Sequence, residues 1–199
     1  MTASDALPLL KAEMRNAALA RRAAIAPAAA QAAAQAVVAR GLALARRASQ
    51  PAVALYLPMR GEFDCLPLLD ALTHAGFATA LPAIGGRGRP LAFRLWRSGE
   101  PLGQGPFGVR EPLPDSPPAH PAVIFAPLAA FDRAGHRIGY GGGFYDVTLE
   151  ALRAQQGHGL IVAGLAFAVQ ECPKIPAEPH DQQLDFVLTE NETINCAGA

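Results

Sequence analysis

Short apolar runs separated by helical patterns constrain the fold of this chain more than any other feature. The two clearest runs, AVALYL at 52–57 and AVIFA at 122–126, are continuously apolar rather than alternating, which is typical of strands buried on both faces. The predicted strands are 52–57, 77–81, 91–96, 122–126, 160–167 and 186–189. Helices are predicted over 64–75, which ends at Gly76, and over 143–156. This alternation predicts an α/β fold, a mostly parallel sheet covered by helices on both faces.

The first 48 residues differ from the rest in composition. Alanine makes up 17 of the 32 residues in 17–48, and Pro27 suits the first turn of a helix, so two helices are predicted, over 4–23 and 27–48. Residues 1–47 carry seven Lys or Arg against two acids. This region is therefore expected to be a basic helical region facing something anionic, with an organelle transit peptide as the alternative.

No linker or internal repeat divides the chain. We therefore predict a single domain over 1–199, with an N-terminal helical region (1–48) and an α/β core (52–190). The segment 99–121 is rich in proline and glycine and is expected to be an irregular surface loop.

Composition argues against several classes of protein. With 17 basic and 17 acidic residues the formal net charge is zero, which gives no general reason to expect a nucleic-acid or membrane partner. The longest apolar runs, 121–131 and 159–169, are shorter than the roughly 18 residues of a membrane span. Three widely spaced cysteines without a CxxC pair favour neither a disulfide framework nor a zinc site. We therefore expect a cytoplasmic protein.

The segment 131–146, FDRAGHRIGYGGGFYD, carries the strongest functional signal. Its glycines lie between a predicted strand and a predicted helix, at Gly139, Gly141, Gly142 and Gly143. Glycine allows close backbone approach, so that N–H groups can surround an anion at the helix N-terminus, and Arg137 can add a bidentate phosphate contact. The segment predicts a phosphate-binding loop, although it matches neither GxxxxGK[ST] nor GxGxxG. The alternative is a tight turn beside a solvated arginine.

Charged side chains elsewhere extend this prediction. Asp146, in the first turn of the following helix, would repel phosphate unless magnesium lay between them, and Asp181 can serve the same ion. Lys11 and Arg15 are like charges four residues apart on a helix, which is mildly destabilising and would be offset by a bound phosphate. The alternatives are a carboxylate favoured by the helix dipole, a loop acid and a solvated basic face.

Glu62, in YLPMRGEFD, follows the first predicted strand, where open α/β sheets bind ligands. Its carboxylate can accept two hydrogen bonds from an amidine-like edge such as a 2-aminopyrimidinone. An ordinary acid at a helix start is the alternative.

Taken in order, these segments resemble the 5-formyltetrahydrofolate cyclo-ligase family over nearly the whole chain. The resemblance is carried by KAEMR (11–15), YLPMRGEFD, GLAFAVQ (164–170) and HDQQLDFVLTE (180–190), and most specifically by the glycine segment closed by an aspartate. It implies a magnesium-dependent ligase that uses ATP to close 5-formyltetrahydrofolate to 5,10-methenyltetrahydrofolate, releasing ADP and phosphate. A non-catalytic folate- or nucleotide-binding relative is the alternative, and an RNA-binding module using the basic N-terminal region is a further one.

The resemblance also implies roles for individual residues. Lys11 and Arg137 would act as catalytic cations, and Asp146 and Asp181 as magnesium ligands. ATP would be bound by Lys11, Arg15, Arg137, Gly139, Tyr140, Gly141, Gly142, Gly143, Phe144 and Tyr145. The folate pocket would be lined by Leu57, Glu62, Phe107, Tyr140 and Phe144.

Two departures from the family pattern are visible. Phe144 replaces a usual tyrosine, and Tyr140 and Gly142 stand where some members carry Lys or Arg, which shifts the cationic load to Lys11, Arg15 and Arg137. The expected partners are small molecules only, for a monomer or a homodimer.

Overall fold

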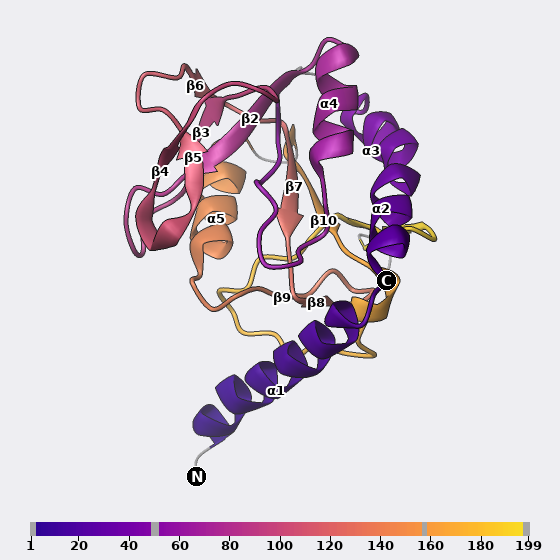
Figure 1. Ribbon diagram of the computed structural model, residues 1–199. Helices are drawn as coiled ribbons and strands as arrows, with labels where there is room; N and C mark the ends of the chain where they lie inside the picture. The colour runs from indigo at the N-terminus through magenta and orange to yellow at the C-terminus, as the bar shows by residue number, and fades with distance from the viewer. Residues whose placement is uncertain (1–2, 49–51, 157–158, 197–199) are drawn as a thin grey trace.

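The computed structural model describes residues 3–48, 52–156 and 159–196. Its centre is an eight-stranded sheet (Figure 1). In spatial order the strands are β12 (Thr193–Asn195), β11 (Phe186–Leu188), β10 (Ile161–Leu165), β7 (Val123–Pro127), β1 (Ala52–Ala54), β2 (Ala78–Ala83), β3 (Ala92–Leu95) and β6 (Pro118–Ala119). Neighbouring strands are parallel from β11 to β2, whereas β12, β3 and β6 are antiparallel at the edges. The predicted α/β class with a mostly parallel sheet is confirmed.

Helices cover both faces of the sheet, also as predicted. On one face lie α2 (Pro27–Ala36), α3 (Val38–Ala45) and α4 (Leu66–His74), and on the other lies α5 (Phe144–Gln156). Side chains alternate along a strand, so Val53 of β1 packs beneath the first group and Ala54 belongs to the cluster beneath α5. Both side chains are fully buried.

The first helix, α1 (Ala3–Ala23), lies outside these two layers. In Figure 1 it crosses below the sheet, at the end toward which the arrow of β7 points. Met14 and Ala18 anchor it in a small apolar cluster with Ile138 of the short hairpin β8 (Ala130–Phe131) and β9 (Arg137–Ile138). The side chains of α1 are therefore brought to the carboxyl ends of the parallel strands.

Several boundaries follow from local chemistry. Helix α4 ends in a left-handed Gly76 with a φ of 89°. The amide of Gly76 bonds the carbonyl of Thr73, and that of Phe77 bonds the carbonyl of Leu72, which is the Schellman pattern expected of a glycine after a helix.

The predicted helix over 27–48 is divided. It breaks at Val37, which ends α2 and precedes α3. Val37 is fully buried, and beyond the break Gly41 lies so close to α4 that a Cβ there would be 2.5 Å from Leu68 Cδ1. The alanine-rich sequence predicts helix throughout, but packing against α4 decides where the helix bends.

The prediction of an irregular loop over 99–121 is wrong. This segment contains β4 (Leu102–Gln104), the 3-10 turn η1 (Pro106–Gly108), β5 (Arg110–Pro112) and β6. β4 and β5 form a hairpin, and Glu111 ties it to the main sheet by accepting a hydrogen bond from the Ile84 amide at 3.0 Å. Proline is tolerated here because an edge strand leaves part of its backbone without ladder partners. The final strand, β12, is a further element that its short, partly polar sequence did not predict.

One helical stretch in the described ranges, Pro27–Ala45, is long and apolar enough by length and composition to cross a membrane. It contains no long continuous apolar run, because polar residues interrupt its alanines. This is weak evidence for a span, since core helices of soluble proteins satisfy the same criterion. Here Ala33, Val37 and Leu44 are buried in the main core.

Candidate active site

A cavity of about 560 Å³ opens at the carboxyl ends of the parallel strands. The chain runs from β1 to β2 on one side of β1 and reaches β7, β10 and β11 on the other, so the strand order reverses between β1 and β7. Ligands of open α/β sheets bind in the crevice outside such a reversal. Residues at or beyond the carboxyl ends of β1, β2 and β7 line the cavity, among them Leu57, Glu62, Ile84 and Pro127.

The glycine loop, residues 139–143, forms one wall of this cavity. The hairpin β8–β9 delivers it, and the turn of that hairpin is fixed by Asp132, whose buried carboxylate accepts bonds from the amides of His136 and Ile175 at 3.0 and 2.8 Å. Gly141 and Gly143 both have positive φ values, 87° and 65°. The loop therefore needs glycine at these positions, and α5 begins immediately after it, as the sequence predicts.

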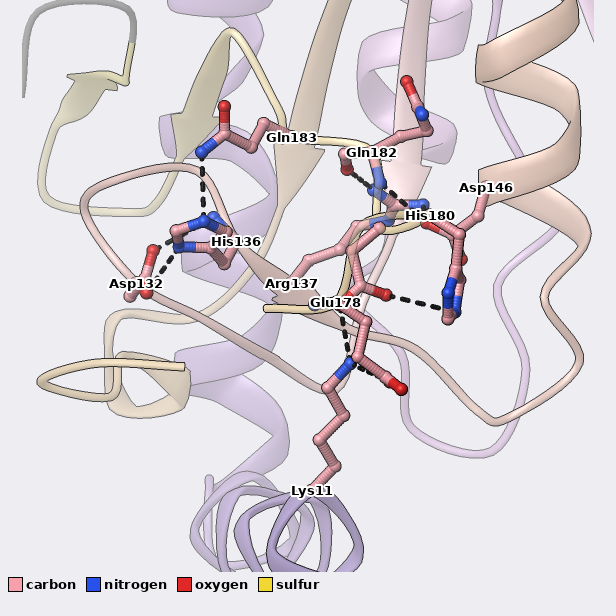
Figure 2. A network of polar contacts seen from close by, with 10 residues as sticks. Lys11, Asp132, His136, Arg137, Asp146, Glu178, His180, Gln182 and Gln183 are labelled. Carbon is pink, nitrogen blue, oxygen red and sulfur yellow. Dashed lines mark hydrogen bonds and ion pairs between the residues drawn. The ribbon is translucent and has the colours of Figure 1, made fainter. Parts of the chain in front are cut away.

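Among the cations that line the cavity, Lys11 and Arg137 are each paired with at least one acid (Figure 2). Lys11 Nζ lies 2.6 Å from Asp181 Oδ2 and 2.8 Å from Glu178 Oε2. Arg137 donates to Asp146 Oδ1 at 2.7 Å and to the carbonyl of Gln182. The cations that the sequence predicts to bind phosphate are thus neutralised by carboxylates. Those carboxylates could bind a metal ion instead.

These pairs shift the ionisation of their members. Burial opposes the charge on Lys11, but the hydrogen bonds and charges of Asp181 and Glu178 outweigh it, so its pKa is raised. Burial likewise opposes ionisation of Asp181, and bonds from Lys11 and the Glu178 amide leave its pKa lowered. The pKa of Arg137 is lowered by burial, against the attraction of Asp146.

Arg15 also reaches the site, through its Nε atom, which donates to the Gly139 carbonyl at 2.7 Å. The like charges of Lys11 and Arg15 on one face of α1 therefore have separate protein partners: two carboxylates for one and a loop carbonyl for the other. Their repulsion is offset within the protein, so their spacing does not by itself require a phosphate.

Glu62 also lines the cavity, together with apolar lining residues such as Leu57 and Leu81. Burial raises the pKa of Glu62, against hydrogen bonds from the Met59 amide and Tyr140. Close by, the Tyr145 hydroxyl is buried and finds no hydrogen-bond partner among the residues that the structure describes. Tyr145 and Glu62 both line the cavity. A bound molecule with polar edges can satisfy this hydroxyl, whereas a purely apolar one would leave it unpaired.

Phe107, which the sequence predicts to line the folate pocket, is not among the residues that line this cavity. It lies at the tip of the β4–β5 hairpin, is 55% exposed and has a φ of 61°. Its ring centroid is 6.1 Å from that of Phe144, which does line the cavity. The hairpin, which the sequence did not predict, carries Phe107 to the rim and leaves contact with the interior to Phe144.

The acids predicted to share one magnesium ion are engaged differently. Asp181 is grouped with Glu178 and His180, whose possible ligand atoms lie within 4.8 Å of one another. Asp146 is outside that group and pairs with Arg137. Oxygen donors from Glu178 and Asp181 fit magnesium, because it prefers carboxylate and water ligands, and Lys11 now occupies the place between them.

Glu178 is a candidate site residue that the sequence analysis missed. It lies three residues before Asp181 and its carboxylate contacts the same lysine. The clustering of acids in AEPHD was the available signal. The remaining predicted residues, the glycine loop with Tyr140, Phe144 and Tyr145, are all brought to the cavity.

The chain is similar to known proteins over most of its length. Residues 9–190 match the model of the 5-formyltetrahydrofolate cyclo-ligase family. The chain is 34% identical to the 5-formyltetrahydrofolate cyclo-ligase of Mycolicibacterium smegmatis, over 94% of this chain and 97% of that one. It is 31% identical to the Escherichia coli protein of the same name, over 85% and 94% of the two chains.

A solved structure gives the same result. The NMR structure of 5,10-methenyltetrahydrofolate synthetase from Aquifex aeolicus superposes with a TM-score of 0.78 at 26% identity, covering 96% of this chain and 94% of that one. The match of the family model over most of the chain, the identity with named relatives and the shared fold lead to one conclusion. The chain belongs to the 5-formyltetrahydrofolate cyclo-ligase family of enzymes.

Proposed function

We propose that this enzyme uses magnesium and ATP to close 5-formyltetrahydrofolate to 5,10-methenyltetrahydrofolate, releasing ADP and phosphate. The observation that carries the proposal is one cavity with two chemically different walls. One wall presents the glycine loop with Lys11, Arg15 and Arg137, and the other presents the partly buried Glu62 among apolar residues. A nucleotide phosphate chain suits the first wall, and a reduced pterin suits the second.

The phosphate wall supports phosphoryl transfer without a protein nucleophile. Such transfer depends on positioning and on neutralising charge around the phosphorus. Lys11 and Arg137 supply positive charge, and the loop amides of 139–143 and the N-terminus of α5 supply aligned N–H dipoles. Both cations are paired with acids, so ATP binding would exchange carboxylate partners for phosphate oxygens.

Asp181 and Glu178 would hold magnesium, and Asp146 faces the same cavity beside Arg137. When bound, the ion supplies charge neutralisation for the phosphates. It would also relieve the repulsion that these carboxylates would otherwise exert on ATP. With these two acids engaged by the ion, the Lys11 ammonium would be able to contact phosphate.

The folate wall orients the formyl group. Glu62 can accept two hydrogen bonds from the amidine-like edge of the pterin, which makes it an orienting group. The formyl oxygen attacks the γ-phosphorus and ADP leaves, giving an iminium phosphate at N5. N10 then attacks the formyl carbon, the carbon–oxygen bond breaks with release of phosphate, and N10 loses its proton. ATP thereby converts a poor leaving group, an amide oxygen, into a good one.

The test is formation of the methenyl product from 5-formyltetrahydrofolate, followed by its near-ultraviolet absorbance with and without ATP and magnesium. Arg137→Met and Asp146→Asn are expected to lower the rate at least 100-fold, since charged groups around a transferring phosphoryl contribute on the order of 10²–10³. Arg133→Met is the matched control, because Arg133 lies in the same hairpin but forms exposed ion pairs with Glu171 and Glu192.

Product formation without ATP, or equal rates in Arg137→Met and Arg133→Met, would refute the proposal. Binding of folate and ATP without turnover would indicate a non-catalytic relative instead.

A further inference from the structure

Helix α1 carries a buried arginine that the proposed chemistry does not use. Arg22 is 8% exposed, so its guanidinium is largely removed from water. Removing a guanidinium from water is costly unless its N–H groups are satisfied. Arg22 donates to the Tyr140 hydroxyl at 2.6 Å and to the Arg60 carbonyl at 2.8 Å. Both partners are neutral oxygens. The buried guanidinium therefore depends on these two hydrogen bonds, and in turn it holds the two oxygens in place.

The two oxygens belong to two separate segments of the chain, each of which contributes residues to the cavity lining. Tyr140 is part of the glycine loop, 139–143, and its ring also lies under the guanidinium, with 5.9 Å between Arg22 Cζ and the ring centroid. Arg60 belongs to the turn 59–62, which carries Glu62. One side chain from α1 therefore bridges the candidate phosphate wall and the candidate folate wall.

The turn 59–62 is one that needs support. Arg60 has a φ of 50°, a left-handed conformation that is uncommon for a residue with a side chain, and Gly61 follows with a φ of 72°. Within the turn, the Glu62 amide bonds the Met59 carbonyl at 2.9 Å, and the Glu62 carboxylate accepts from the Met59 amide at 3.0 Å. The bond from Arg22 to the Arg60 carbonyl fixes this turn from outside.

Tyr140 links Arg22 to the Glu62 side chain. Its hydroxyl accepts from Arg22, so its own hydrogen is available to the nearby Glu62 carboxylate, whose pKa Tyr140 lowers against the effect of burial. Although 46% of Tyr140 is exposed, its hydroxyl is directed inward onto these partners. Displacing Tyr140 would disturb Glu62, and displacing the turn would disturb Tyr140, because both share Arg22.

We propose that Arg22 is a positioning residue that couples the glycine loop to the Glu62 turn, so that nucleotide and folate each favour the binding of the other. Because the coupling is an equilibrium property, it must be reciprocal. The identity of the two ligands rests on the proposed function. The bridge itself is a property of the unliganded chain, so it can be tested without them.

The first experiment measures amide hydrogen exchange in the unliganded protein. Arg22→Met is expected to speed exchange in both 59–62 and 139–143 by about tenfold or more, the scale set by losing a hydrogen bond to a charged donor. Arg21→Met is the matched control. Arg21 is next to Arg22 on α1, but it is exposed and donates to the carbonyls of Val169 and Glu171, which lie outside both loops. Arg22→Lys keeps the buried charge if Arg22→Met fails to fold. It is expected to loosen both segments less, because one nitrogen replaces the guanidinium fork.

Faster exchange in only one of the two segments, or in neither, would overturn the proposal. So would equal effects of the Arg21 and Arg22 variants.

The second experiment measures the coupling itself by calorimetry. The affinity for a non-hydrolysable ATP analogue with magnesium is measured with and without saturating 5-formyltetrahydrofolate. The wild-type ratio is expected to be about fivefold or more, the usual lower range of coupling, and to fall toward one in the Arg22 variants but not in Arg21→Met. A ratio unchanged by loss of Arg22 would overturn the coupling. If neither ligand binds the wild type while exchange changes in both loops, the proposed function fails and the bridge stands.

Discussion

Replacing Lys11 by methionine tests the electrostatic design of the site most directly. The substitution keeps an unbranched side chain of similar reach but removes the charge between Asp181 and Glu178, which lie 2.6 and 2.8 Å from the ammonium nitrogen. Lys11 is 13% exposed, and the two acids are 20% and 32% exposed. The three groups are thus shielded enough for their charges to affect stability, yet open enough for a ligand to reach them.

Two contributions determine how much Lys11→Met lowers the free energy of unfolding. Hydrogen bonds between charged groups contribute about 1.5–3 kcal/mol each, a range reduced here by partial exposure. The two carboxylates, with ligand atoms within 4.8 Å, would also repel by about 3 kcal/mol at an effective dielectric constant of about 20 before they relax apart. Because relaxation and water relieve much of this, we expect Lys11→Met to lower the free energy of unfolding by about 2–3 kcal/mol at pH 7.

The pH dependence of this loss identifies its cause. The lowered pKa of Asp181 gives stability that is present above its unfolded value of about 3.9 and disappears as the pH falls through the folded pKa. The raised pKa of Lys11 gives stability that is present below about 10.4 and disappears as the pH rises through the folded pKa. The difference between wild type and variant should therefore be largest near neutral pH and shrink at both extremes.

Urea unfolding of both proteins across this pH range measures the difference. Lys174→Met is the control, because the exposed Lys174 is the only other lysine in the chain. If Lys11→Met costs as much at pH 3 as at pH 7, the contribution comes from packing of the aliphatic stem, and the reasoning from charge is refuted.

Four further outcomes are expected. Lys11→Met should bind Mn²⁺ more tightly than the wild type, measured by electron paramagnetic resonance, because the ammonium no longer competes for the acids; weaker binding would contradict this. Glu62→Gln should raise the KM for folate about tenfold or more while leaving that for ATP nearly unchanged, as expected for loss of one charged hydrogen-bond acceptor. In the wild type, folate binding should weaken as the pH falls through the raised pKa of Glu62, since only the ionised group accepts both bonds; Glu62→Gln should lack this dependence. Gly135→Ala should lower the unfolding free energy by more than about 2 kcal/mol, because φ is 86° and a Cβ would lie 2.5 Å from the Leu184 carbonyl oxygen, whereas Gly85→Ala, in open space, should change it little.

Much of the fold could be predicted because its signals are local. The runs at 52–57 and 122–126 are apolar without alternation, and the strands they contain, β1 and β7, lie at the centre of the sheet, buried on both faces. The hairpin at 102–112 and the last strand at 193–195 were missed. They pair at edges or outside the main sheet, where the sequence need not be apolar and proline does not interrupt the ladder.

The sequence by itself determined the glycine loop and its place between a strand and a helix. Those features depend on backbone freedom at Gly141 and Gly143 and on the dipole of α5, all within a few residues.

Only the tertiary structure decided which charges meet. Lys11 contacts acids 167 and 170 residues away, and Arg22 reaches two loops that are 38 and 118 residues distant. It also separated Asp146 from the group around Asp181 and placed Phe107 at the rim. Pairing of this kind leaves no periodic trace in the sequence, because it depends on how α1 packs across the carboxyl ends of the strands.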